Sequence, residues 1–450
     1  MRNETLLVFL LISSVVNASS SIVTWIFPFV NQIDPSSGAD GYFAGVLLWS
    51  DYPAEVYLDS FLDGSFSTKI TLKLNVESKF PDSYYAYVAY SNWDVNSYDK
   101  APLIIRVPSN VGIEFWWLSN DLGIYDEDWS FSSPPLPGTK FYLPPIPGKL
   151  YVTVVRPGEV ARVYYDNDLA GEVSYGKYLE IDHDGSYALL TSTDDVVVVL
   201  ANYNSKNRDR NYVTPILPVR YYYKVSMLPD NQEGPLSLLA PDATPITKAY
   251  ILYEDGTHEI MFLDSNAKLI TLPKRAAIYV YYEVTRKDPW ARAIRTYVGV
   301  EAIPPPGEID YLLSQGPCDF SGWGGDEKII NVISGKIEIY DTSGNLINTY
   351  GKGLHVFKCS DFGDPVRIRV SGIVQAMKIG EKSWANELGA IFASGYAPST
   401  VNTSQSVSLC LCITTATTTY TTTKTLVERV PTPLLLALLG GVLLGKRRKR

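Results

Sequence analysis

The stretch that decides the fold is Lys69-Ile70-Thr71-Leu72-Lys73-Leu74-Asn75-Val76. Polar and apolar side chains alternate strictly along it. Because successive side chains of a strand point to opposite faces, this period of two predicts a β-strand with one buried and one wet face. Residues 336–339 and 366–370 alternate in the same way, whereas residues 196–200 and 277–282 are apolar on both faces. The latter two runs indicate central strands covered on both sides.

Turn residues lie where hairpins need them, at Asp63-Gly64, Asp184-Gly185, Asp255-Gly256 and Ser343-Gly344-Asn345. We find no amphipathic helical window between residues 22 and 400. Short strands separated by regular turns predict an all-β protein of two or three β-sandwich or barrel-like domains in tandem.

Proline-rich segments at 134–137, 144–147 and 304–306 mark the joints, because proline is excluded from central strands. They predict β domains over residues 22–133, 148–302 and 308–397. A faint repeat links two of them: Tyr165-Asp166 and Tyr175-Gly176-Lys177 recur 175 residues later as Tyr340-Asp341 and Tyr350-Gly351-Lys352. Duplicated β modules explain the repeat, and so does the chance similarity of hairpins.

The two ends predict an exported protein anchored in a membrane. Residues 1–18 combine Arg2, a short apolar run and the cleavage-like Val16-Asn17-Ala18, as a signal peptide does. Residues 430–445 are uncharged, and five basic residues follow at 446–450. A helix of that length spans about 24 Å, slightly short of a roughly 30 Å hydrocarbon core. The basic tail places 446–450 in the cytoplasm and the ectodomain outside.

The apolar segment also resembles sorting tails that sortase-type enzymes remove, so both a retained and a processed anchor are open. Outside it lies a Ser/Thr-rich stalk over 398–429, with nine threonines in the twelve residues 414–425. Such a run cannot bury a core and is typical of glycosylated stalks. Asn402 begins an N-glycosylation sequon, which makes it a glycosylation candidate.

Net charge limits the classes of binding partner, and the cysteines limit the possible disulfides. The formal charge is −9, and without the five cytoplasmic cations the exported part carries −14, since Arg2 and Glu4 cancel. An acidic exterior argues against nucleic acid as a partner. Among four cysteines, Cys318 and Cys359 form a disulfide candidate in an oxidising exterior, with free buried thiols as the alternative.

Three segments carry a resemblance to a known family: Ser192 to Val199, Pro215 to Tyr223, and Leu239 to Thr244. Over roughly residues 148–285 their order resembles the N-terminal β domain of IgG-Fc-binding proteins. The chain lacks the glycine that this family tends to place before its aromatic strand. The resemblance implies a secreted, adhesive β module and carries over no particular binding residue.

Motifs for catalysis are sparse. No G-x-S-x-G elbow occurs, and His183, His258 and His355 are expected at the surface of hairpins. Asp126-Glu127-Asp128-Trp129 sets acids beside an aromatic ring, as in a glycosidase, although a solvated loop explains it too. We therefore expect no catalytic residues and no bound cofactor.

Calcium is the one metal that the sequence allows. The candidate oxygen ligands are Asp166, Asp168, Asp182 and Asp184, which are spaced at alternate positions in two turns. Neither turn continues into a full calcium loop, and plain hairpin turns are the alternative.

Aromatic runs at 115–117 and 221–223 place rings on both faces of a strand. Outward rings suit protein or glycan recognition, whereas a large core would bury them. The sequence as a whole predicts a non-enzymatic, adhesin-like surface glycoprotein that binds an extracellular protein or glycan. The alternatives are an envelope or S-layer-type subunit that self-associates and a tethered polysaccharide hydrolase.

Overall fold

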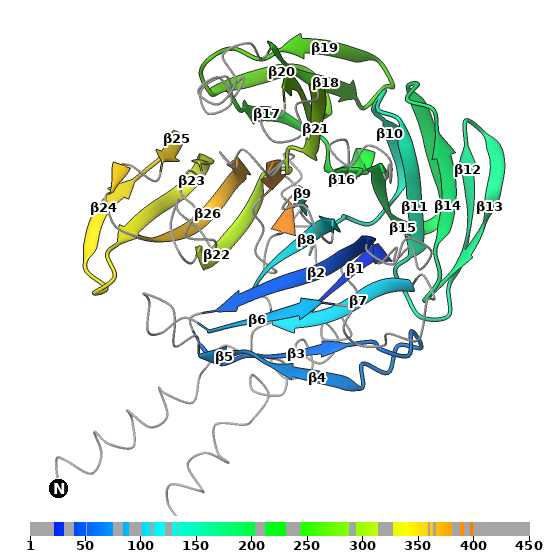
Figure 1. The fold of residues 1–450 in the computed structure, drawn as a ribbon, viewed down its shortest axis with the longest axis horizontal. Helices are drawn as coiled ribbons and strands as arrows, with labels where there is room; N and C mark the ends of the chain where they lie inside the picture. The colour runs from blue at the N-terminus through cyan, green and yellow to red at the C-terminus, as the bar shows by residue number, and fades with distance from the viewer. Residues whose placement is uncertain are drawn as a thin grey trace, which may run out of the picture.

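The computed structural model is all-β wherever it describes the chain, and every strand pairing in it is antiparallel (Figure 1). The described residues are 22–30, 40–50, 52–74, 84–89, 101–108, 111–121, 128–132, 134–202, 212–230, 244–287, 294–313, 327–358, 361–362, 366–379, 388–390 and 397–398. The described ranges contain the 3-10 turn η3 (Val219–Tyr221) and no α-helix. None of these ranges holds a helix long and apolar enough to cross a membrane.

Two sheets form the N-terminal part. Sheet A has the order β1-β7-β3-β4, with β1 (Ile22–Val30), β7 (Ala101–Pro108), β3 (Glu55–Leu58) and β4 (Thr68–Thr71). Sheet B has the order β5-β6-β2-β8-β9, with β5 (Lys73–Leu74), β6 (Tyr84–Ala89), β2 (Asp40–Ser50), β8 (Gly112–Asp121) and β9 (Asp128–Ser132). Both contribute side chains to one core, among them Trp25 and Leu48.

The alternating stretch 69–76 does not form the single strand that its pattern predicts. It splits into β4 in sheet A and β5 in sheet B. Leu72, between them, is buried in the core, and its amide donates to the Ala54 carbonyl at 2.9 Å. Burial of this one side chain therefore fixes the point at which the chain passes from one sheet to the other.

Sheet C forms the next part, in the order β13-β12-β15-β11-β14, with β10 and β16 also paired to β15. Its strands are β10 (Gly138–Leu143), β11 (Gly148–Val154), β12 (Val160–Tyr165), β13 (Asp168–Ser174), β14 (Leu179–His183), β15 (Ala188–Asn202) and β16 (Tyr212–Pro215). Residues 196–200 of β15 are all buried, which confirms the prediction of a central strand.

Sheet D has the order β17-β20-β18-β19, and β21 pairs with β20. Its strands are β17 (Tyr223–Leu228), β18 (Thr244–Tyr253), β19 (His258–Phe262), β20 (Lys268–Lys287) and β21 (Ile294–Ala302). Residues 277–280 and Tyr282 are buried, as predicted for a central strand, but Tyr281 is only half-buried.

Sheet E completes the fold in the order β24-β23-β26-β22-β28, with β25 paired to β23 and β27 to β26. Its strands are β22 (Gly307–Leu313), β23 (Glu327–Tyr340), β24 (Leu346–Tyr350), β25 (Gly353–Lys358), β26 (Arg367–Ile379), β27 (Leu388–Ala390) and β28 (Ala397–Pro398). Val366, Ile368 and Val370 are buried and the two arginines between them are not, so the predicted alternation is confirmed.

Sheets C and E share a strand order, β13-β12-β15-β11 in one and β24-β23-β26-β22 in the other. The sequence repeat falls on equivalent elements: β12 and β23 end at Tyr165 and Tyr340, and each is followed by a turn and an edge strand. The shared topology supports the duplication. The copies differ in their third strand, since β14 pairs with β11 whereas β25 pairs with β23.

The predicted Asp-Gly and Gly-Asn turns are confirmed. The glycines of all four turns have positive φ, from 83° to 88°, at Gly64, Gly185, Gly256 and Gly344. In each turn an aspartate accepts a backbone amide, as Asp184 does from Ser186 at 2.8 Å. These local bonds explain why turn positions were readable from sequence.

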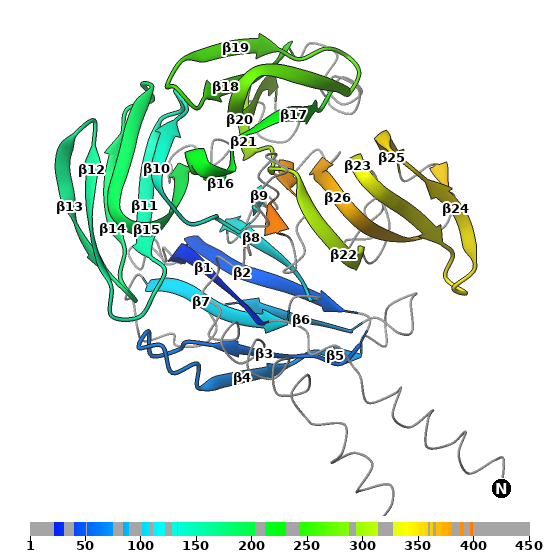
Figure 2. The same ribbon diagram turned by 180° about the vertical axis from the view of Figure 1, so that it is seen from behind.

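The five sheets are joined by packing and by buried hydrogen bonds. One continuous core takes side chains from sheets A to D and also Ile329 and Met377 of sheet E. Sheets C and E lie at opposite ends of the longest axis, with sheets A, B and D between them (Figures 1 and 2). The proline-rich segments 134–137 and 144–147 flank β10, and the three-domain division stays a prediction.

Candidate binding surface

Several predicted sites lie outside the described residues. They are the signal peptide 1–18, the stalk from residue 399 on, the anchor 430–445, Cys318, Cys359 and Asn402. Asp126 and Glu127 lie outside as well, and for residues 114–121 and 128–132 only the backbone is described. The disulfide, glycosylation and anchor therefore stay predictions.

The calcium candidates serve as turn or surface residues in the structure. Asp166 accepts the Leu189 amide at 2.8 Å, and Asp182 is exposed with its carboxylate 3.9 Å from the Lys149 ammonium. Hydrogen bonds from Ser186 lower the pKa of Asp184. Asp168 is exposed at the start of β13. Within the described ranges no three His, Cys, Asp or Glu side chains gather as a metal site, and calcium binding remains an untested prediction.

The expectation for His183 is wrong: this side chain is buried, not at a hairpin surface. Its Nε2 lies 2.9 Å from the Pro144 carbonyl oxygen and its Nδ1 lies 2.9 Å from Tyr165 Oη. A carbonyl only accepts, so Nε2 carries the proton and Nδ1 accepts from Tyr165. Burial lowers the pKa of His183 and favours this neutral form. His183 is thus a structural tie between β14 and the proline-rich segment before β11.

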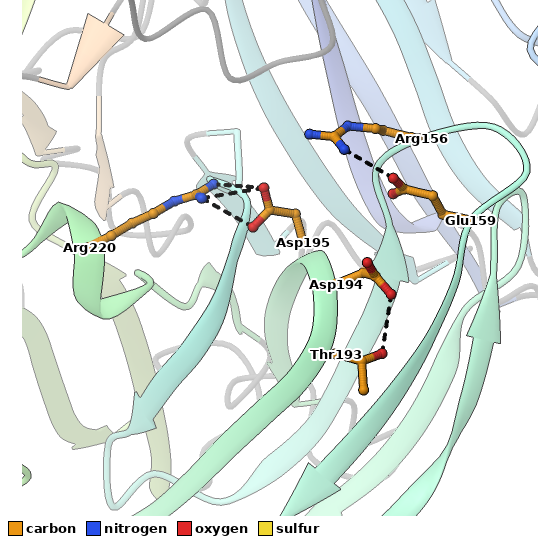
Figure 3. A network of polar contacts seen from close by, with 6 residues as sticks. All are labelled: Arg156, Glu159, Thr193, Asp194, Asp195 and Arg220. Atoms are coloured by element: carbon orange, nitrogen blue, oxygen red, sulfur yellow. Dashed lines mark hydrogen bonds and ion pairs between the residues drawn. The ribbon is translucent and has the colours of Figure 1, made fainter. Parts of the chain in front are cut away.

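Figure 3 shows a set of polar contacts around sheet C. Arg220 of η3 reaches Asp195 of β15 with contacts of 3.1 to 3.4 Å to both carboxylate oxygens. Arg156 meets Glu159 at 3.1 Å, and Thr193 lies 3.2 Å from Asp194. Because a bidentate arginine occupies both oxygens of Asp195, this pair acts as a clamp between β15 and the segment leading to sheet D.

The aromatic run 221–223 belongs to the core. Tyr221, Tyr222 and Tyr223 are all buried, and Tyr223 Oη donates to the Ile303 carbonyl at 3.0 Å. Of the two interpretations of this run, burial in a large core is the one that the structure shows. The run is not the single strand that the sequence predicts, because Tyr221 ends η3 and only Tyr223 belongs to β17.

Two exposed apolar side chains, Ile260 and Phe262, lie instead on sheet D. We call the sheet D face the set Lys248, Tyr250, Ile260, Phe262 and Tyr281, of which Tyr250 is buried in the core and Lys248 and Tyr281 are half-buried. Phe262 is 70% exposed and Ile260 is 50% exposed, although both belong to a regular strand. Contiguous exposed apolar side chains mark candidate recognition surfaces.

Strand register brings these five residues together. Lys248 of β18 lies opposite Phe262 of β19 on one side and Tyr281 of β20 on the other. Tyr250 lies two residues after Lys248 on β18, directly opposite Ile260 of β19. Because side chains alternate along a strand, this pair lies on the same face as Lys248 and Phe262. The Lys248 ammonium lies 5.1 Å from the Tyr250 ring and 5.0 Å from the Tyr281 ring, in cation–π range.

The far end of β19 is fixed against sheet C. The His258 ring stacks on the Tyr187 ring with centroids 3.4 Å apart and planes 18° apart. Tyr253 Oη donates to Glu259 at 2.7 Å, which holds the opposite face of the strand. The strand is thus anchored at His258, and its exposed side chains lie toward Phe262.

The chemistry of this face suits a ligand with flat apolar surfaces and hydrogen-bonding edges. The exposed Phe262 ring suits stacking on a sugar or peptide surface, and Lys248 offers a polar contact beside it, while Tyr281 Oη already donates to Glu283. Sequence reasoning missed it because His258-Glu259-Ile260-Met261-Phe262 looks like an ordinary half-buried strand. Nothing local in it says that β19 is an edge whose apolar side chains extend past the core.

Comparison with known proteins finds only distant structural similarity. No known family matches this sequence, and no curated protein sequence does. A solved structure titled biofilm associated protein, BSP domain, aligns over 84% of this chain and 96% of its own at 9% identity, with a TM-score of 0.15. A β-D-glucuronidase of Dictyoglomus thermophilum aligns over 62% of this chain and 46% of its own at 8% identity, with a TM-score of 0.12.

A β-glucuronidase of Bifidobacterium dentium, complexed with coumarin-3-O-glucuronide, aligns over 64% of this chain and 51% of its own. Its identity is 10% and its TM-score 0.11. Likenesses this low carry no argument about fold or activity. None of the comparisons bears out the resemblance to IgG-Fc-binding proteins, which stays a prediction.

Proposed function

We propose that this chain is a non-enzymatic, membrane-anchored cell-surface protein whose β ectodomain binds an extracellular protein or glycan, in the manner of an adhesin. The observation that carries the proposal is the sheet D face, where Phe262 and Ile260 stay exposed beside Lys248 and Tyr281. The predicted signal peptide, stalk and anchor would present such a face outside the cell.

Two described polar groups that could take part in proton transfer are engaged within the fold. Asp195 accepts hydrogen bonds from Arg220, and both ring nitrogens of His183 are hydrogen-bonded, one to Tyr165 and the other to the Pro144 carbonyl. A general acid or base must be within reach of a substrate proton. These groups are instead directed at neighbours within the fold.

The test is binding of the full chain, in mild detergent, to a glycan array and to a panel of extracellular matrix proteins. Phe262→Ala and Lys248→Met should each weaken the binding that is found by about tenfold, the effect of losing roughly 1.4 kcal/mol at a recognition hot spot. Leu169→Ala, an exposed aliphatic change on sheet C, is the matched control and should bind as the wild type does. Binding that both face variants leave intact would refute the assignment of this face.

A further inference from the structure

Strand β19 is an open edge of sheet D. It comes last in the order β17-β20-β18-β19, and both views show it along the outer rim of the molecule (Figures 1 and 2). Among the described strands only β18 pairs with it, and that pairing is regular from Lys248↔Phe262 to Leu252↔His258, with no bulge. The strand contains neither lysine nor proline. Bulges, lysine and proline commonly protect an edge from further pairing, so β19 lacks these three protections.

The hydrogen bonds at the two ends of β19 show which of its backbone groups face outward. The Tyr253 amide donates to the Thr257 carbonyl at 2.8 Å, and the Leu263 amide donates to the Thr247 carbonyl at 3.1 Å. The backbone at 257 and 263 therefore faces β18. Because this direction alternates along an antiparallel ladder, the N–H and C=O groups of residues 258, 260 and 262 point to the free side.

The same positions carry the exposed apolar side chains. Ile260 is 50% exposed and Phe262 is 70% exposed. A polypeptide strand that pairs with this edge gains main-chain hydrogen bonds and covers both side chains at once. A glycan stacks on an aromatic ring but supplies no ladder of amide and carbonyl groups. The edge therefore fits an extended polypeptide better than a glycan.

Charge around β19 decides which polypeptide fits. The aspartates beyond its two ends are ion-paired, Asp255 with Lys274 and Asp264 with Lys268. Glu259 lies exposed between them and makes no ion pair with any residue that the structure describes. A second copy of β19, antiparallel and fully overlapping, would set the two Glu259 side chains at diagonal positions, where like charges repel. A lysine or arginine opposite Glu259 is attracted to it instead.

We propose that β19 takes up an extended segment of a partner protein as an added antiparallel strand, with apolar side chains opposite Phe262 and Ile260 and a lysine or arginine opposite Glu259. The inference rests on the proposed function and names its ligand as a polypeptide of this pattern. In chain order the segment has an apolar residue opposite Phe262, any residue opposite Met261, an apolar residue opposite Ile260 and then the basic residue.

A labelled, capped peptide of sequence Thr-Val-Thr-Val-Lys-Val-Thr is the probe, and fluorescence anisotropy with the full chain in mild detergent measures its affinity. Its first valine is designed to face Phe262, its second valine Ile260 and its lysine Glu259. N-methylation of the second valine removes an amide that points at β19 and should weaken binding by about tenfold. N-methylation of the second threonine is the matched control, because that amide points away from β19, and this peptide should bind as the parent does.

Two protein variants test the same register. Ile260→Pro removes an outward N–H and no hydrogen bond to β18, as proline does on edge strands. It should bind the peptide about tenfold more weakly than Ile260→Ala, which keeps that N–H. Glu259→Lys should weaken binding of the parent peptide and restore binding of a peptide in which glutamate replaces lysine. If Ile260→Pro melts early, the two N-methylated peptides decide on the wild-type chain.

Equal affinity of the two N-methylated peptides, or no binding of the parent peptide, would overturn the proposal. Phe262-dependent binding on the glycan array without peptide binding would overturn it and leave the proposed function standing. Absence of glycan, matrix-protein and peptide binding would remove both. A wild-type dimer in sedimentation velocity that Ile260→Pro dissociates would assign the edge to a second copy of this chain and overturn the proposal as well.

Discussion

At the scale of single residues, His183 is buried where the sequence predicts a surface position. In the fold it is neutral, buried, and hydrogen-bonded through both nitrogens, and burial lowers its pKa. An unfolded chain exposes the same imidazole with a pKa near 6.5. Between the two values the unfolded chain binds more protons, so acid favours unfolding.

We predict that stability is full above about pH 6.5 and falls as the pH drops toward the lowered pKa of folded His183, by about 1.4 kcal/mol per pH unit in that window. His183→Gln should flatten this fall. Thermal unfolding at pH 7.5 and pH 5.0 measures it. An equal slope in wild type and His183→Gln would contradict the prediction.

A second residue-scale prediction concerns the contact between sheets A and C. Tyr175 Oη donates to Asp59 Oδ2 at 2.8 Å, and the buried Asp59 also accepts the Gly64 amide at 2.6 Å. Hydrogen bonds to a charged group contribute about 1.5–3 kcal/mol. Tyr175→Phe should therefore lower the free energy of unfolding in urea by about that amount. Tyr164→Phe, at a partly exposed tyrosine on the same sheet, should change it little.

Residues whose partners are close in sequence were predictable, and residues whose partners are distant were not. Asp184 bonds an amide two residues away, so its turn could be read directly. His183 bonds a carbonyl 39 residues away, and Tyr175 bonds Asp59 across 116 residues. Burial of these polar groups depends on tertiary contacts that no local pattern reports.

At the scale of elements, the neighbouring strands β23 and β26 approach closely where two glycines face each other. Gly335 and Gly372 are paired directly, with φ of 94° and 104°. A Cβ at Gly335 would lie 2.0 Å from the Ser371 carbonyl oxygen, and one at Gly372 would lie 2.3 Å from that of Ser334. The backbones therefore approach more closely here than any side chain permits.

Gly335→Ala should destabilise the protein by about 2–4 kcal/mol, because it adds both backbone strain and a clash with a main-chain atom. Gly351→Ala, where a Cβ meets nothing within 4 Å, is the control and should be close to neutral. Differential scanning calorimetry of both variants measures the difference. Equal melting temperatures of Gly335→Ala and Gly351→Ala would contradict this account of the close approach of β23 and β26.

Periodicity predicted which segments are strands, but not which strands lie at an edge. Residues 366–370 alternate and lie within the sheet as expected, whereas β19 ends in three consecutive apolar residues and lies at the sheet edge with Phe262 exposed. Alternation reports the two faces of a strand and says nothing of its neighbours. Exposure of the sheet D face depends on strand order, and for that reason the sequence alone did not predict it.

At the scale of the whole molecule, the sheets are tied by polar bonds buried in their junctions. Ala302 of sheet D donates to Thr214 of sheet C at 3.0 Å, and Leu217 donates to Tyr279 Oη at 2.9 Å. Buried donors must be satisfied, so each bond penalises the separation of two sheets.

Gln375 is the buried residue on which the junction of sheets D and E depends. Its Oε1 accepts from Asn331 Nδ2 at 3.0 Å and from the Met227 amide at 3.2 Å, while its Nε2 donates to the Pro304 carbonyl at 2.9 Å. Gln375→Met keeps the volume and removes all three bonds, at about 1 kcal/mol each. Because the lost partners belong to the junction, we expect sheet E to loosen first.

Hydrogen–deuterium exchange distinguishes that outcome from general destabilisation. In Gln375→Met the amides of β22, β23 and β26 should exchange faster, by about a hundredfold for roughly 3 kcal/mol, while those of β11 and β15 keep their wild-type rates. Arg369→Met, an exposed change on the same strand, should leave both sets unchanged. Faster exchange in all five sheets at once would instead mean that the molecule opens as one unit and that Gln375 acts only on global stability.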